Sequence, residues 1–136
     1  MKSMAAFLAD AAIDHGDGTF DVRRGGLTDF FLAGLPGVVH FMMFVRVQLD
    51  PTEAANLHYV AIHVMLNGQE IAPWVRWPLA MRSVDPTRDS YFNLMVTFDI
   101  GLPAMGDGYI EAVLDDEIRL PHMQFRVSPI TTLKTP

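Results

Sequence analysis

Strict alternation of apolar and polar residues is the strongest pattern along this chain. In the stretch YFNLMVTFDI, every second residue from Phe92 to Ile100 is apolar, whereas Asn93 and Asp99 fall between them. Side chains of a β-strand point alternately to opposite faces, so one face of this stretch is apolar and the other is largely polar. The stretch therefore predicts a half-buried strand.

The stretch VVHFMMFVRVQL is apolar on both faces over much of its length. Every second residue from Val39 to Leu49 forms one apolar face, and the opposite face carries His40, Met42 and Phe44 before it becomes polar. Such a second apolar face is larger than a solvent-facing sheet tolerates. We therefore expect the N-terminal segment or a partner to cover it.

A tight hairpin is predicted around the dipeptide Asn67-Gly68. The preceding stretch YVAIHVML alternates, and a return strand follows through residues 70–75. Asn-Gly is the preferred pair for this turn because both central residues need positive φ. Pro73 lacks a backbone N–H, so the return strand is predicted to lie at a sheet edge or to be broken.

The C-terminal part predicts a second hairpin and a last strand. The acidic pair Asp115-Asp116 separates YIEAVL from EIRL, and HMQFRV then alternates. The remaining SPITTLKTP loses the pattern. We therefore expect one domain over residues 1–128 and a loose tail over residues 129–136.

The N-terminal segment SMAAFLADAAIDH allows two interpretations. Its alanines and four-residue spacing are typical of a helix capped by Ser3. Alternatively, the turn HGDG and the following TFDVRR predict a hairpin of which the segment is the first strand. The strand is favoured, and the glycine-rich RRGGLTDFFLAGLPG is expected to connect this hairpin to the next strand.

Short strands separated by turns predict an all-β protein. The expected architecture is an antiparallel Ig-like β-sandwich of about seven to nine strands.

Three motifs also support a resemblance, namely FLADAAIDHGDGTFDVRRGG, LNGQE and GLPAMGDGYIEAVLDDE with the later FRV. Over roughly Ala5 to Val127 the chain is similar to a family of small bacterial proteins of unknown function. The last motif also resembles immunoglobulin and fibronectin type III domains, where a proline and a glycine precede a tyrosine that opens a strand. The resemblance implies an Ig-like sandwich with a strand at the N-terminus, and it implies no activity. Glu111 departs from the pattern, because it shares the face of Tyr109, where an apolar residue is usual.

Composition and charge narrow the functional classes. The 136 residues have a formal net charge of −6 and no cysteine. The charge argues against nucleic acid as a partner, since its binding needs clustered Lys and Arg. The absence of cysteine excludes disulfides and thiolate chemistry, and it fits a cytoplasmic protein. No membrane span is expected, because the apolar run near the N-terminus is short and is interrupted by Asp10.

No catalytic, cofactor or metal site is predicted. The five histidines form no H-x-x-x-H pair, although a cross-strand pair of His40 and His63 stays open. The acidic residues around Asp115 lack the spacing of a calcium loop, and the glycines lead into strands rather than into a helix that could bind phosphate. There is also no G-x-S-x-G motif. A non-catalytic protein is therefore favoured over an enzyme.

The stretch PWVRWPLAM suggests a protein interface. Trp74 and Trp77 lie three positions apart, so in a strand they face opposite ways, and tryptophan beside arginine is frequent at interfaces. The alternative is a tryptophan in the core of the sandwich. The residues of the possible interface are His40, Met42, Phe44, Tyr59, His63, Met65, Trp74, Arg76, Trp77 and Met95.

Two functional hypotheses follow. The first is an interaction or assembly module that binds a protein partner or a second copy of itself through a sheet face or edge. The second is a sandwich that binds a small ligand, a sugar or a metal at its loop ends near His40, His63 and Trp74.

Overall fold

The computed structural model describes residues 2–79 and 85–130, and it confirms the prediction of an all-β protein. Almost all regular structure in these residues is strand. The elements in chain order are β1 (Lys2–Ala9), β2 (Ala11–Asp14), β3 (Phe20–Arg23), β4 (Asp29–Leu32), β5 (Gly37–Leu49), α1 (Pro51–Ala54), β6 (His58–Leu66), β7 (Gln69–Leu79), β8 (Ser90–Leu102), β9 (Gly106–Leu114), β10 (Ile118–Arg119) and β11 (Met123–Pro129).

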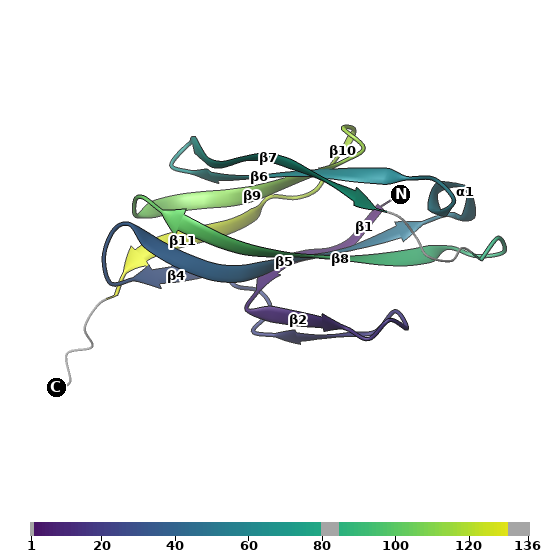
Figure 1. The fold of residues 1–136 in the computed structure, drawn as a ribbon, viewed down its shortest axis with the longest axis horizontal. Coiled ribbons are helices and arrows are strands. Elements are labelled where there is room, and N and C mark those ends of the chain that lie inside the picture. The colour runs from purple at the N-terminus through teal and green to yellow at the C-terminus, as the bar shows by residue number, and fades with distance from the viewer. Residues whose placement is uncertain (1, 80–84, 131–136) are drawn as a thin grey trace.

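The strands form two main sheets and a separate hairpin (Figure 1). The smaller sheet has the order β1-β5-β8, and the larger sheet has the order β4-β11-β9-β6-β7 with β10 beside β9. The third unit is the β2–β3 hairpin. In Figure 1, β5 and β8 of the smaller sheet lie between β6 of the larger sheet and the β2–β3 hairpin.

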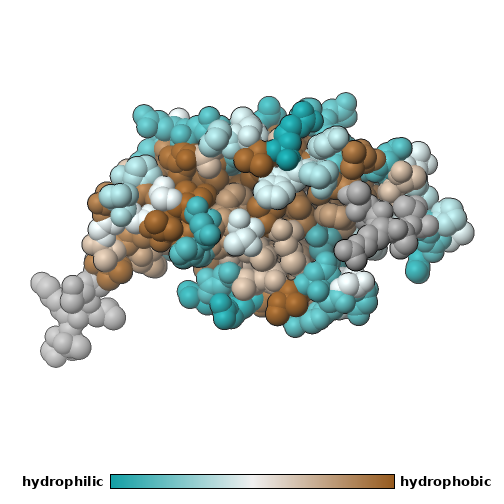
Figure 2. All heavy atoms as spheres, in the orientation of Figure 1, coloured by the Kyte–Doolittle hydropathy of each residue, from teal (hydrophilic) through white to brown (hydrophobic). Residues whose placement is uncertain are grey.

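The hydrophobic core lies between the two main sheets. On β5 the buried face runs through every second residue from Val39 to Leu49, as the alternation predicts. The larger sheet contributes the buried faces of β6 and β9, and the ring of Phe30 on β4 lies 5.0 Å from that of Phe41 on β5. Figure 2 accordingly shows apolar residues as a band between more polar upper and lower margins.

The N-terminal segment is extended, so the strand interpretation is confirmed. It is divided at Asp10, however, and only its second half pairs with β3 as the hairpin prediction requires. The first half, β1, pairs with β5 instead. β1 extends the sheet beside β5, whereas β2 and β3 leave the sheet. This division suits the apolar side chains on both faces of β5.

Both predicted turns are present. Asn67 and Gly68 have φ of 52° and 76°, and Asp115 and Asp116 have φ of 51° and 59°. The strand after Asn67-Gly68 is β7, which is the last strand of its sheet, as Pro73 led us to expect.

Two details of the architecture differ from the prediction. The described residues contain eleven strands, and β4 pairs with β11 in parallel rather than antiparallel. The additional strand β4 comes from the glycine-rich stretch that we expected to be a connection. There Phe30 and Leu32 are buried while Asp29 and Phe31 are exposed, which is the alternation of a short strand.

The C-terminal boundary lies slightly later than predicted. β11 continues to Pro129, and the N–H of Ile130 donates to the carbonyl of Leu32 at 2.9 Å. The rest of the predicted tail, from residue 131, lies outside the described residues.

None of the described helices has the length and apolar character needed to span a membrane.

Candidate binding surface on the larger sheet

The residues predicted to form one interface lie on two different sheets. β5 and β8 belong to the smaller sheet and carry His40, Met42, Phe44 and Met95, whereas β6 and β7 belong to the larger sheet and carry Tyr59, His63, Met65, Trp74, Arg76 and Trp77. The sequence gives no sign of this separation, because β5 and β6 follow each other in the chain. They are separated by α1, whose N-terminal cap at Asp50 lies where the chain passes from one sheet to the other.

The cross-strand pair of His40 and His63 is therefore wrong. Nδ1 of His40 contacts the carboxylate of Asp99 on β8. His63 instead faces Glu111 on β9 of the larger sheet. Neither histidine marks a loop end, since both lie within strands.

On the smaller sheet, the N-terminal segment covers the second apolar face at Phe44. The ring of Phe44 lies 5.0 Å from that of Phe7 and 4.4 Å from that of Phe20. Its exposed fraction is 0%. Arg46 also binds the hairpin, because its Nη1 donates a hydrogen bond to the carbonyl of Gly18 at 3.0 Å. Of the two covers that we expected, the N-terminal segment is the one that covers Phe44.

The outer face of the larger sheet is centred on a buried carboxylate. Glu111 is only 7% exposed, and it is the one buried charged residue in the described part of the chain. Its Oε2 lies 3.5 Å from Nε2 of His63 and 3.3 Å from Nε2 of His122. Its Oε1 accepts a hydrogen bond from Nη1 of Arg119. We call Glu111, His63, His122 and Arg119 the Glu111 cluster.

Each histidine of the cluster stacks on an aromatic ring. The ring of Trp74 lies 3.6 Å from that of His63, with 13° between the planes. The ring of Tyr109 lies 4.1 Å from that of His122, with 2° between the planes. The buried carboxylate thus positions two aromatic rings through their histidine neighbours.

The register explains the position of Glu111. Ile110, Ala112 and Leu114 form the buried face of β9, so Tyr109 and Glu111 lie together on the opposite, outer face. The pairing of β9 with β6 contains no shift that a bulge would cause. The expectation that this face is apolar was therefore wrong. His122 and Arg119 could not be found from the sequence, because only the fold brings them to Glu111.

A hollow lies next to the Glu111 cluster on the same face. Its volume is about 480 Å³, and it is lined by Thr28, Asp29, Asp107, Gly108, Tyr109, Gln124, Phe125 and Arg126. Nε of Arg126 donates to Oδ1 of Asp107 at 2.9 Å, and this hydrogen bond raises the pKa of Arg126. The lining thus combines carboxylates, a guanidinium, an amide and two aromatic rings.

The histidines and carboxylates do not form a metal site. Within residues 2–79 and 85–130, no group of three or more His, Asp or Glu side chains could hold a metal ion. In the Glu111 cluster, His63 lies on β6 at one side of β9, and His122 directly precedes β11 at the other side.

The edge of the larger sheet at β7 is rich in exposed apolar surface. Trp74, Val75 and Trp77 are 45%, 47% and 42% exposed, and the neighbouring Tyr59 on β6 is 39% exposed. The two tryptophans do face opposite ways, since Trp74 stacks on the outer face and Trp77 pairs with the core residue Val60. Neither of them is a core tryptophan, contrary to the alternative interpretation.

Neighbouring residues of β6 direct their backbone groups to opposite sides, either toward β9 or toward β7. The N–H of Asp115 donates to the carbonyl of Tyr59 at 2.8 Å, which places the backbone groups of Tyr59 on the β9 side. Because these directions alternate along a strand, Val60 and Ile62 direct theirs toward β7.

The alternation on β7 follows from this. Trp77 and Val75 are the β7 partners of Val60 and Ile62, so their backbone groups face β6. Arg76 lies between these two residues, so its N–H and C=O groups face away from β6, and continuing the alternation beyond Val75 directs those of Trp74 the same way. No strand in the described residues pairs with this side of β7.

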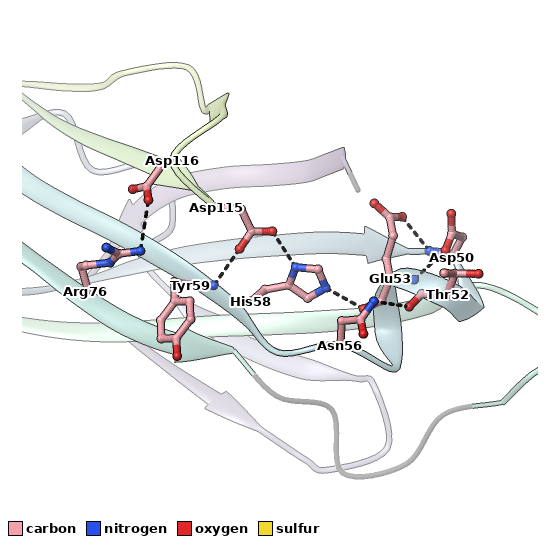
Figure 3. A network of polar contacts seen from close by, with 9 residues as sticks. All are labelled: Asp50, Thr52, Glu53, Asn56, His58, Tyr59, Arg76, Asp115 and Asp116. Atoms are coloured by element: carbon pink, nitrogen blue, oxygen red, sulfur yellow. Dashed lines mark hydrogen bonds and ion pairs between the residues drawn. The ribbon is translucent and has the colours of Figure 1, made fainter.

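A polar network fixes the end of β6 next to this edge (Figure 3). Nδ1 of His58 lies 2.6 Å from Oδ2 of Asp115, and its Nε2 lies 2.6 Å from the carbonyl oxygen of Glu53. Burial lowers the pKa of His58, but the hydrogen bonds to Glu53 and Asp115 outweigh burial and raise this pKa above its ordinary value. The guanidinium of Arg76 lies 5.2 Å from the centre of the Tyr59 ring and forms an ion pair with Asp116.

The cluster histidines contact carboxylates and rings, and the aromatic side chains of the β7 edge are exposed. The chain matches no protein-family model and no curated protein, so its function is inferred from this geometry alone.

Proposed function

We propose that this chain is a non-catalytic assembly module of the cytoplasm, with an Ig-like sandwich arrangement, that binds a protein partner or a second copy of itself through β7. The observation that carries the proposal is the free edge at Trp74 and Arg76. There, backbone groups that no strand of the described residues pairs with lie next to large apolar side chains that are exposed by about 40% or more. Such an edge is a ready template for a strand from another chain.

The residue types at this edge support binding. Tryptophan, tyrosine and arginine dominate the binding energy of protein interfaces because they combine a large apolar area with a polar group. Trp74 and Arg76 are also held in place before binding, the first by His63 and the second by Tyr59 and Asp116. Side chains that are already ordered lose less conformational entropy when a partner binds.

The proposal is tested with two substitutions at one position. Arg76→Pro removes the outward N–H and the side chain, whereas Arg76→Ala removes the side chain alone. The inner ladder to β6 stays intact in both variants, because the N–H of Arg76 does not face β6. Each protein is immobilised and used to capture partners, including added free chain, from an extract of the cells that produce it. Binding through the edge is lost in R76P and is largely kept in R76A. Equal capture by all three proteins, or no capture at all, would contradict the proposal.

We also propose a second candidate function, the binding of a small hydroxyl-rich ligand such as a sugar in the hollow beside Tyr109. Two carboxylates and one guanidinium give the lining no excess of positive charge for an anion, and hydroxyl groups can both donate to Asp29 and Asp107 and accept from Arg126. The Tyr109 ring offers a flat apolar surface, which His122 holds in place. Titration calorimetry with a panel of mono- and oligosaccharides, repeated with Tyr109→Ala, tests this function. Heat that appears for one sugar class and disappears in Y109A supports it, and an absence of heat throughout the panel refutes it.

A further inference from the structure

We propose that the partner of β7 is a second copy of this chain, paired antiparallel to the first about a two-fold axis at Val75. This inference rests on the proposed function and specifies its partner and register. It follows from the order of residues in the segment Trp74–Trp77, which is complementary to itself when it is reversed.

The backbone groups fit such a pairing. In an antiparallel ladder centred on Val75, Trp74 of one copy lies opposite Arg76 of the other, and the reverse pair is identical by symmetry. These are the two residues of the segment whose N–H and C=O groups face away from β6. Each of the two pairs exchanges two hydrogen bonds, so every outward donor and acceptor of Trp74 and Arg76 finds a partner.

The side chains fit the same register. Directly opposite residues of an antiparallel pair share a face, so the guanidinium of Arg76 lies beside the indole ring of Trp74 from the second copy, on the outer face. Guanidinium and indole attract each other through the ring's electrons. On the inner face, Val75 meets Val75 of the second copy, and 47% of its surface is exposed in the single chain. The symmetric contact thus joins a cation to an aromatic ring on the outer face and two valine side chains on the inner face.

Two prolines keep the ladder short. Pro73 and Pro78 lie on either side of the segment and have no N–H to donate. The pairing of β7 with β6 is also irregular between Val75 and Ala72, and such an irregularity bends a strand. The ladder therefore ends close to the axis on both sides, and the contact closes on two copies instead of propagating into a fibre.

Disulfide formation tests the register directly. In the proposed dimer, Val75 of one copy lies opposite Val75 of the other in a non-hydrogen-bonded pair. The two Cα atoms of such a pair lie about 4.5 Å apart. This separation is within the range of about 4.4–6.8 Å that a disulfide needs. The chain has no cysteine, so Val75→Cys introduces a single thiol. Val38→Cys is the matched control, because Val38 is also a strand valine and is even more exposed, at 62%.

Under mild oxidation at equal concentrations, we expect V75C to form a covalent dimer and V38C to remain mostly monomeric. Sedimentation of the reduced proteins provides the second measurement. R76P removes two of the four hydrogen bonds, so its dimer dissociation constant should rise about tenfold to hundredfold, and that of R76A should rise less. Equal cross-linking of V75C and V38C overturns the inference.

Two results separate this inference from the proposed function. If V75C does not cross-link but R76P still loses a captured protein that R76A retains, the edge binds a different partner and only the second copy is refuted. If neither cross-linking nor capture depends on β7, both are refuted.

Discussion

The outer faces of the two sheets differ in what lies at their centres. On the smaller sheet, the β2–β3 hairpin covers the apolar side chain of Phe44 completely. On the larger sheet, no described hairpin covers the outer face, and the central position is taken by the buried carboxylate of Glu111. The chain itself covers the first face at Phe44, whereas Glu111 lies at the centre of the second face.

Under the proposed function, the covered position contributes to stability and the larger sheet contributes to binding. An apolar side chain under a hairpin contributes stability through burial, whereas a carboxylate between two histidines holds neighbouring aromatic rings in place. Each of the following predictions tests whether the two faces have these different roles.

The largest effect is expected on the covered face. Phe44→Ala should lower the free energy of unfolding by about 3–5 kcal/mol, because it leaves a cavity between Phe7 and Phe20. Chemical denaturation monitored by circular dichroism measures the change. Val38→Ala on the same strand is the control, and it should change the stability by less than about 0.5 kcal/mol. A similar loss in both variants would mean that the hairpin does not cover this face.

The next largest effect is expected at the centre of the larger sheet. Glu111→Ala removes the carboxylate that His63, His122 and Arg119 contact, and it should lower the free energy of unfolding by about 2–3 kcal/mol. Glu117→Ala, at an exposed turn position, is the control and should change it by less than about 0.5 kcal/mol. In E111A the fluorescence of Trp74 should also change, since His63, which stacks on the indole ring, loses its contact with Glu111 and keeps only that with Glu70. Unchanged fluorescence would argue against a positioning role for Glu111.

A pH dependence of the unfolding free energy is expected from His58 on β6 of the larger sheet. His58 has a raised pKa in the folded protein, so its contribution to stability is fully present below its unfolded pKa of about 6.5. It is lost as the pH rises through the folded pKa. The difference in unfolding free energy between the wild type and His58→Gln should therefore shrink from pH 6 to about pH 9. A difference that grows over this range would contradict the contacts with Glu53 and Asp115.

The alternation in the sequence predicts the strands well, because the buried faces of β5, β6 and β9 follow from local periodicity. Asn67-Gly68 and Asp115-Asp116 predict their turns for the same local reason, which is the need for positive φ. The sheet to which a strand belongs is not a local property. His40 and His63 are neighbours in the pattern but lie on different sheets, and β4 was missed because four residues carry too little periodicity.

The candidate site was predictable only in part. Glu111 could be identified from the sequence as an acidic residue on the face of Tyr109, although the face itself was misjudged. His122 precedes the last strand and gives no pattern, so its contact with Glu111 depends on the pairing of β11 with β9. Trp74 and Arg76 were predicted as interface residues from their chemical types, and the free edge beside them is a property of the sheet order.

The smallest effect is expected for a histidine that faces a carboxylate on the smaller sheet. The side chain of His40 is 73% exposed beside Asp99, whereas that of His63 is 11% exposed between Glu111 and Glu70. Water screens the exposed pair, so His40→Ala should change the free energy of unfolding by less than about 0.5 kcal/mol. His63→Ala removes a buried contact and the stack on Trp74, and it should lower this energy by about 1–2 kcal/mol. Denaturation of the two variants in parallel measures the difference. If H40A loses as much as H63A, the polar contacts of the two faces are equivalent, and the distinction between the two faces fails.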